Sequence, residues 1–124
     1  MKKFINKILH KNQYFEGIIV EESLSDNRII NNYDVISFEI TLDDDISNRW
    51  HLFKICIRRD QISDMQFHIK QGWYMHFWSG HTLIVVFKEK VFEIDRYDRS
   101  SWNEAIEYGL KIGISKEQLD FVSE

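Results

Sequence analysis

Hydrophobic positions near the start of the chain recur with a helical period. Phe4, Ile5, Ile8 and Leu9 fall on one side of a 3.6-residue repeat, and three lysines occupy the opposite side. This pattern predicts a short amphipathic helix over residues 2–11. We expect this helix to dock on a sheet, although a basic amphipathic helix also suits a membrane surface.

A first strand is predicted over residues 14–22, with a loop after it. Two later segments then alternate between apolar and polar positions, as half-buried strands do. Their apolar members are Ile36, Phe38, Ile40 and Leu42 in the first segment, and His51, Phe53, Ile55 and Ile57 in the second. If Phe38 pairs with Ile55, then Lys54 lies opposite Glu39, and the two segments form an antiparallel hairpin.

The second half of the chain alternates between helical and extended patterns. Asp60 has the character of an N-cap, a helical stripe follows it, and Gly72 stands where a glycine ends a helix. Three strands in quick succession are then predicted over residues 73–79, 82–88 and 91–95. Short turns at Ser79-Gly80-His81 and at Glu89-Lys90 join them into a meander.

The end of the chain carries two helix-start patterns. Ser101 with Glu104 and Ser115 with Gln118 have the spacing of capping boxes. We therefore expect an α+β protein with one antiparallel sheet of about six strands. The sheet would be packed with an N-terminal, a middle and C-terminal helices, in a single domain over residues 1–124.

The meander divides its side chains between two faces. One face is almost entirely apolar and is expected to be core; it carries Tyr74, His76, Trp78, Leu83, Val85, Phe87, Phe92 and Ile94. The other face is apolar at one end and acidic at the other; it carries Trp73, Met75, Phe77, Thr82, Ile84, Val86, Glu93 and Asp95. Two alternatives are open for this second set of side chains. Either a helix covers them, or they form an open apolar patch of the kind that binds a partner.

Composition limits the classes of function. The chain has nine Phe, five Tyr and four Trp among 124 residues, no proline, and a formal net charge of −4. The negative charge argues against nucleic acid as a partner. A single cysteine, Cys56, cannot form an internal disulfide, and no apolar run is long enough to span a bilayer. We therefore expect a cytoplasmic protein whose N-terminus is not a signal peptide.

Candidate chemistry is sparse. His76 and His81, five residues apart around a turn, are weak candidates for metal ligands, because a site needs three or four ligands. Cys56 is expected to be a packed free thiol, and the loop with Asp43, Asp44 and Asp45 lacks the spacing of an EF-hand. No phosphate-binding loop, nucleophile elbow or paired-carboxylate frame occurs, so no catalytic residue and no cofactor is predicted.

From Gly72 onward the chain resembles a family of small bacterial cytosolic proteins. The resemblance rests on GWYMHFW, LIVVFKEKVFEI and SSWNEAIEYGLKIGISKEQLDF, which together span about the last 50 residues. It implies no reaction and no cofactor, because none is assigned to that group, and it transfers no functional residue.

Two hypotheses of function follow. The first is a non-enzymatic protein-binding module, forming a homodimer or binding another protein in an immunity or regulatory role. Its surface would be Trp73, Met75, Phe77, Ile84 and Val86, with Tyr74 and Trp78 at the edge. The second is a protein that binds a small molecule or a metal, either as a simple binding protein or as an enzyme. Its pocket would lie near His76, Trp78 and Cys56.

Overall fold

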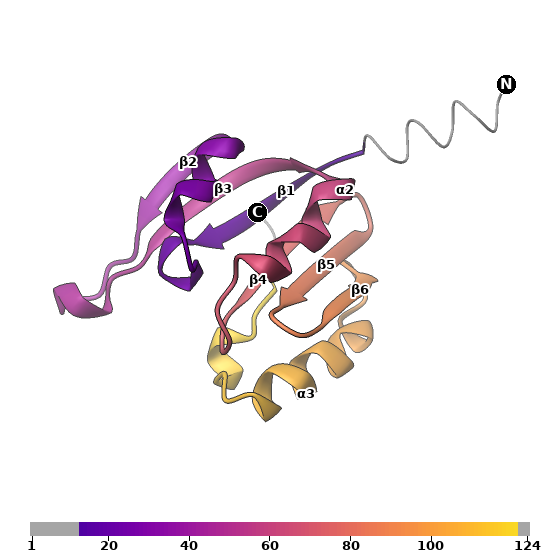
Figure 1. Ribbon diagram of the computed structural model, residues 1–124. Coiled ribbons are helices and arrows are strands. Elements are labelled where there is room, and N and C mark those ends of the chain that lie inside the picture. The colour runs from indigo at the N-terminus through magenta and orange to yellow at the C-terminus, as the bar shows by residue number, and fades with distance from the viewer. Residues whose placement is uncertain (1–12, 122–124) are drawn as a thin grey trace, which may run out of the picture.

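The computed structural model describes residues 13–121, and in this range the chain forms a six-stranded sheet with helices on both faces (Figure 1). Every neighbouring pair of strands is antiparallel, and the spatial order is β2-β3-β1-β4-β5-β6. The strands are β1 (Tyr14–Val20), β2 (Asp34–Ile40), β3 (His51–Arg58), β4 (Tyr74–Ser79), β5 (Thr82–Phe87) and β6 (Val91–Asp95). The predicted α+β class and antiparallel sheet are confirmed, whereas the predicted helix over 2–11 lies outside the described residues.

Most of the helical segments are short. They are η1 (Glu21–Ser23), η2 (Asn27–Asn32), η3 (Ile46–Asn48), α2 (Arg59–Ile62), η4 (Ser63–Phe67), η5 (Arg99–Trp102), α3 (Asn103–Lys111) and η6 (Lys116–Gln118). The η elements are 3₁₀ turns, and α3 is the longest helix in residues 13–121. None of the described helices has the length and apolar character needed to cross a membrane.

A hydrophobic cluster covers each face of the sheet. We call the side that carries Phe15, Ile19, Ile55, Met75, Phe77, Ile84 and Val86 the first face; residues from η2, α2 and η4 complete its cluster. We call the side that carries Ile18, Val20, Leu52, Cys56, Tyr74, His76, Trp78, Val85 and Phe87 the second face. Trp102 and Ala105 pack on the second face together with the C-terminal Leu119 and Phe121. In Figure 1, α2 crosses one side of the sheet and α3 runs along the other.

The hairpin of β2 and β3 forms, but in a different register from the predicted one. Phe38 lies opposite Phe53 rather than Ile55, so Lys54 faces Ser37 instead of Glu39. Lys54 pairs instead with Glu16 of β1, at 3.8 Å. A shift of two residues keeps every side chain on its face, so the apolar alternation alone cannot choose between the two registers. A bulge at Ile36 interrupts the ladder further along β2.

The helix caps also differ from those that the sequence predicts. The middle helix begins at Arg59, where the Gln61 side chain accepts a hydrogen bond from the Arg58 backbone, and it becomes a 3₁₀ turn after Ile62. Near the C-terminus, Asp98 rather than Ser101 caps the first turn, accepting a hydrogen bond from the backbone of Ser100. A carboxylate two residues before the donor satisfies it as well as the predicted serine could.

Candidate functional site

The meander face proposed from the sequence as a binding surface is covered. Met75, Phe77 and Val86 are fully buried and Ile84 is 6% exposed, so no partner can reach them. Ile62 and Met65, from α2 and η4, belong to the same cluster and close over this face. The covered alternative is therefore the correct one, and the open patch formed by these residues is wrong.

The acidic end of that face reaches its rim, as a covered face requires. Glu93 is opposite Ile84 in the ladder and forms an ion pair with Arg59 of α2, which lies over the face.

Trp73, the first of the predicted binding residues, is partly buried. Its ring meets the ring of Trp50 at 5.1 Å between centroids, in an edge-on arrangement.

Tyr74, His76 and Trp78 lie on the second face, in the second cluster. The His76 ring is 5.4 Å from that of Trp78 and 6.4 Å from that of Phe121, between ring centroids. Trp78 is only 4% exposed, so it is part of the core rather than the edge of a binding surface. His76 is likewise buried among aromatic rings, as the sequence predicts for this face.

One part of the second face stays open as a groove of about 570 Å³. Its lining consists of Ile18, Val20, Trp50, Leu52, Gly72, Trp73, Tyr74, His76, Ile114, Gln118 and Asp120. The Tyr74 hydroxyl donates a hydrogen bond to the Gln118 carbonyl. Burial, with a smaller contribution from the Asp120 charge, raises the pKa of Tyr74 to about 12. The groove is therefore mostly apolar and aromatic, with a polar rim.

The three residues of the predicted pocket share the second face but do not form one site. His76 lines the groove, whereas Trp78 and Cys56 lie outside its lining. Trp78 and Cys56 both pair with Glu16 of β1, so one strand separates them. Burial, followed by the charges of Asp34 and Glu16, raises the pKa of the Cys56 thiol and makes it a poor nucleophile.

The proposed metal pair of His76 and His81 is not brought together. The ladder places Val85 opposite His76, while His81 lies in the turn that joins β4 and β5. His81 is exposed; its Nδ1 is 3.8 Å from a carboxylate oxygen of Asp95 and its ring packs edge-on against Tyr97. The structure therefore gives these two weak candidates for metal ligands no shared site.

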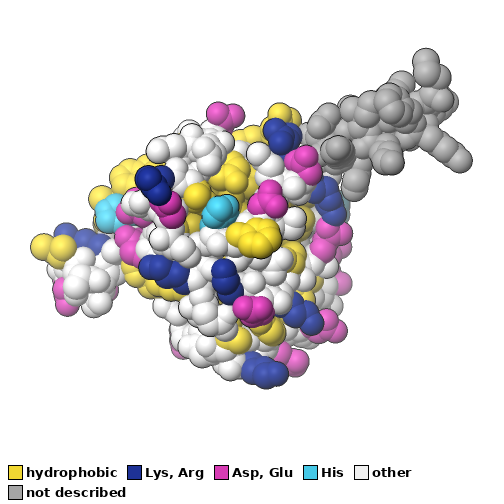
Figure 2. Space-filling model, viewed as in Figure 1, with side chains coloured by type: hydrophobic (Ala, Val, Ile, Leu, Met, Phe, Trp, Pro, Cys, Tyr) yellow, Lys and Arg dark blue, Asp and Glu magenta, His cyan; other side chains and the backbone are white. Residues whose placement is uncertain are grey.

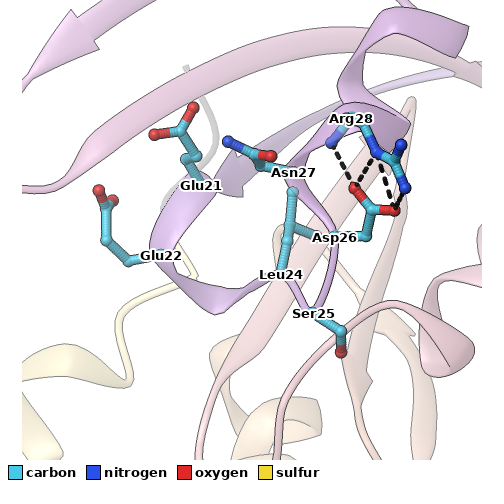
Figure 3. Close-up of a pocket in the computed structure, with 7 residues that line it drawn as sticks. All are labelled: Glu21, Glu22, Leu24, Ser25, Asp26, Asn27 and Arg28. Carbon is cyan, nitrogen blue, oxygen red and sulfur yellow. Dashed lines mark hydrogen bonds and ion pairs between the residues drawn. The ribbon is translucent and has the colours of Figure 1, made fainter.

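A different histidine forms a cluster with two carboxylates. His51 Nδ1 lies 2.7 Å from Glu22 Oε2 and 3.7 Å from Glu21 Oε2. Figure 3 shows both carboxylates projecting from the same side of the turn after β1, beside a shallow hollow of about 540 Å³. Sequence reasoning missed this cluster because the glutamates and His51 are almost thirty positions apart and only the pairing of β1 with β3 brings them together.

The outer strand β2 is the second feature that the sequence pattern did not reveal. Every residue of β2 is exposed, including Val35, Ile36, Phe38 and Ile40. The adjoining turn carries Leu42 and Ile46, which are 94% and 76% exposed. In Figure 2, this end of the hairpin projects from the body of the molecule and has hydrophobic side chains at its tip. The alternation of β2 predicts a buried side, but no described element covers it.

Comparisons with protein-family models, with curated proteins and with solved structures give no match to the chain. The resemblance of residues from Gly72 onward to small bacterial proteins therefore stays a prediction. The described residues offer three candidate sites: the open apolar strand β2, the aromatic groove on the second face and the cluster around His51.

Proposed function

We propose that the protein is a protein-binding module whose binding surface is the free edge of β2, and that its partner is a second copy of the same chain. The observation that carries the proposal is the exposure of large apolar side chains along a strand with one unpaired edge. Such an edge presents backbone N–H and C=O groups ready to pair with another strand.

The two ends of the sheet differ in how they are protected. At the other end, β6 is five residues long and carries Glu93 and Asp95. The Asp95 carbonyl also accepts hydrogen bonds from Ser101 Oγ and Trp102 Nε1, so η5 covers the end of β6. Acidic side chains and a covering segment are devices that keep an edge from pairing. Strand β2 also carries two acidic residues, Asp34 and Glu39, but four of its seven exposed residues are large and apolar. Within residues 13–121, no segment covers its outer edge.

A single open edge favours a closed dimer. Two copies that join through β2 by a two-fold axis leave only the protected β6 edges outside, so the assembly stops at two chains. A pairing centred on Phe38 places the two Phe38 side chains opposite each other. Glu39 then lies opposite Ser37 of the second copy, and no carboxylates are opposed.

The first test measures the mass of the protein in solution by size-exclusion chromatography with light scattering. We expect the unaltered protein to have twice the mass of the 15.0 kDa chain. Phe38→Asp places a charge at the centre of the pairing and is expected to yield the single-chain mass. Phe67→Asp is the matched control, because Phe67 is 77% exposed on η4, away from β2.

The outcomes separate clearly. A concentration of about 100 µM lies well above the dissociation constants of stable complexes. A single-chain mass for the unaltered protein at this concentration contradicts the proposal. So does a dimer that Phe38→Asp leaves intact, or that Phe67→Asp dissociates equally well. Far-UV circular dichroism of each variant verifies that the fold is retained, since Phe38 packs on the Phe53 ring at 4.8 Å.

The groove on the second face supports a second candidate function, binding of a small aromatic molecule. Its volume of about 570 Å³ is typical of small-molecule sites, and Trp50, Trp73 and Tyr74 offer flat apolar surfaces with the His76 ring beside them. Tryptophan fluorescence titrated with a panel of nucleosides and aromatic acids tests it. Saturable quenching that Trp73→Ala removes supports this function, and no quenching at millimolar concentration contradicts it.

A further inference from the structure

We infer that Glu21, Glu22 and His51 form a binding site for one divalent transition-metal ion, of which Zn²⁺ is the best fit. These three side chains bring a nitrogen and carboxylate oxygens within 4.8 Å of one another, a spacing that a single ion can bridge. The inference is independent of the proposed dimer, because all three ligands belong to one chain.

The distances suit direct coordination. Bonds of about 2.1 Å arranged tetrahedrally around zinc place neighbouring ligand atoms about 3.4 Å apart. The two separations from His51 Nδ1, 2.7 Å to Glu22 and 3.7 Å to Glu21, lie on either side of that value. Small side-chain rotations therefore bring all three atoms into one coordination sphere, without movement of the backbone.

The backbone holds the ligands in place before any ion binds. Val20 pairs with Leu52, so the chain on leaving β1 carries Glu21 alongside the start of β3. The Leu24 backbone donates to the Glu21 carbonyl at 3.0 Å, and Ser23 Oγ donates to the Val20 carbonyl at 2.6 Å. The His51 backbone N–H donates to Glu22 Oε1 at 2.7 Å, which leaves Oε2 directed at the imidazole.

The charge of the cluster favours a cation. The ion pairs of both glutamates, within the described part of the chain, involve only His51. The Lys70 ammonium donates to the Glu22 backbone carbonyl at 3.2 Å rather than to a carboxylate. Once the metal has displaced any proton from the ligating imidazole nitrogen, the two carboxylates supply two negative charges to the ion. On binding, the metal takes the place of the hydrogen bond between the His51 ring and Glu22.

The donor set selects the class of metal. Imidazole nitrogen favours Zn²⁺, Ni²⁺ and Cu²⁺ over the alkaline-earth ions, which prefer oxygen alone. The side chains are about one-third exposed, at 39% for His51 and 31% for each glutamate. The two glutamates also border the hollow in Figure 3. Three protein ligands with an open side leave a fourth position for water or for a ligand atom of a partner.

The test is isothermal titration calorimetry of the full chain with Zn²⁺. We expect one ion per chain for the unaltered protein, and affinity at least tenfold weaker after His51→Gln or Glu21→Gln. His81→Gln is the matched control, because His81 also lies beside a carboxylate, that of Asp95, but beside only one. This control is expected to bind as the unaltered protein does, and so is the Phe38→Asp variant.

Two outcomes of the titration overturn the inference. One is the absence of saturable binding up to millimolar Zn²⁺; the other is binding of equal strength by the His51→Gln variant, which would place the ion elsewhere. Backbone NMR with Co²⁺ gives a second readout that does not depend on a variant folding. Paramagnetic shifts and broadening are expected to centre on the amides of Glu22 and His51, and a centre at His81 contradicts the site.

Discussion

Gly17, in the middle of the sheet, has no room for a side chain. A Cβ at this position would lie 2.0 Å from the Phe77 ring and 2.8 Å from the His76 carbonyl oxygen. The strand therefore needs a glycine because β1 and the fully buried Phe77 approach each other closely. The sequence shows only a glycine in an apolar strand, which predicts a bulge or a close approach without saying which.

Gly17→Ala is accordingly expected to lower the free energy of unfolding by about 2–3 kcal/mol, the cost of overpacking a core. Urea denaturation followed by circular dichroism measures this loss. Gly80→Ala is the comparison, because Gly80 has open space around it and a φ of +57°. The strained backbone alone should cost about 1 kcal/mol. Equal losses for the two variants would contradict the role of the close contact.

Tyr74 makes stability depend on pH in the alkaline range. Its pKa is raised to about 12, above an ordinary value of 10, because burial and the nearby Asp120 disfavour the phenolate. A group whose pKa is higher in the folded state stabilises the fold below its unfolded pKa. That stabilisation is lost as the pH rises through the folded pKa.

The free energy of unfolding should therefore fall between pH 10 and pH 12, and the fall should be shallower in Tyr74→Phe. Tyr97→Phe is the control, because it removes the same hydroxyl group from an exposed tyrosine. Urea denaturation across this pH range measures the slopes, and absorbance at 295 nm follows the ionisation directly. Identical slopes for Tyr74→Phe and the unaltered protein would show that Tyr74 does not carry the effect.

At the scale of elements, the position of each strand was predictable and its partner's register was not. The alternation of β2 and β3 assigned their side chains to faces, and the first face does carry Phe38 and Phe53. The register depends instead on the connecting turn. There the backbone N–H of Thr41 donates to the Trp50 carbonyl, and the backbone N–H of Trp50 donates to Thr41 Oγ1. A threonine and a tryptophan nine positions apart give no such signal in the sequence.

The candidate sites show the same limit. Apolar alternation located β4 and β5, yet only the packing of α2 and η4 decided that Met75 and Phe77 are core. The exposure of β2 follows from its place at the end of the sheet, and strand order is not encoded in any local pattern. The cluster around His51 depends on two strands aligned in one register, which spacing along the chain cannot indicate.

Trp50 and Trp73 connect elements that are not neighbours in the sheet. Trp50 precedes β3 and Trp73 precedes β4, and β1 runs between these strands. Their edge-on contact is expected to contribute about 0.5–1.5 kcal/mol beyond the area each buries. A double-mutant cycle with Trp50→Ala and Trp73→Ala, measured by urea denaturation, gives this coupling energy. A coupling energy of zero would mean that the rings only happen to be near each other.

The whole molecule is built on one sheet that two hydrophobic clusters share. Strands β4 and β5 contribute to both, through Phe77 on the first face and Trp78 on the second, so neither cluster can form without the other's strands. This arrangement predicts that the two sides unfold together, although they contact different helices. Small domains usually behave in this all-or-none way.

Substitutions in either cluster should then lower the urea midpoint of one common unfolding transition. Met65→Ala removes a fully buried side chain from the first cluster, and Phe121→Ala removes one from the second. Each should cost about 2–5 kcal/mol, as large-to-small changes in a core do. For each variant, tryptophan fluorescence and far-UV circular dichroism are expected to give the same urea midpoint. Midpoints that separate in Phe121→Ala alone would mean that α3 and the C-terminal segment detach first. The sheet and its first cluster would then be the smallest unit that stays folded, and the shared strands would not couple the two faces.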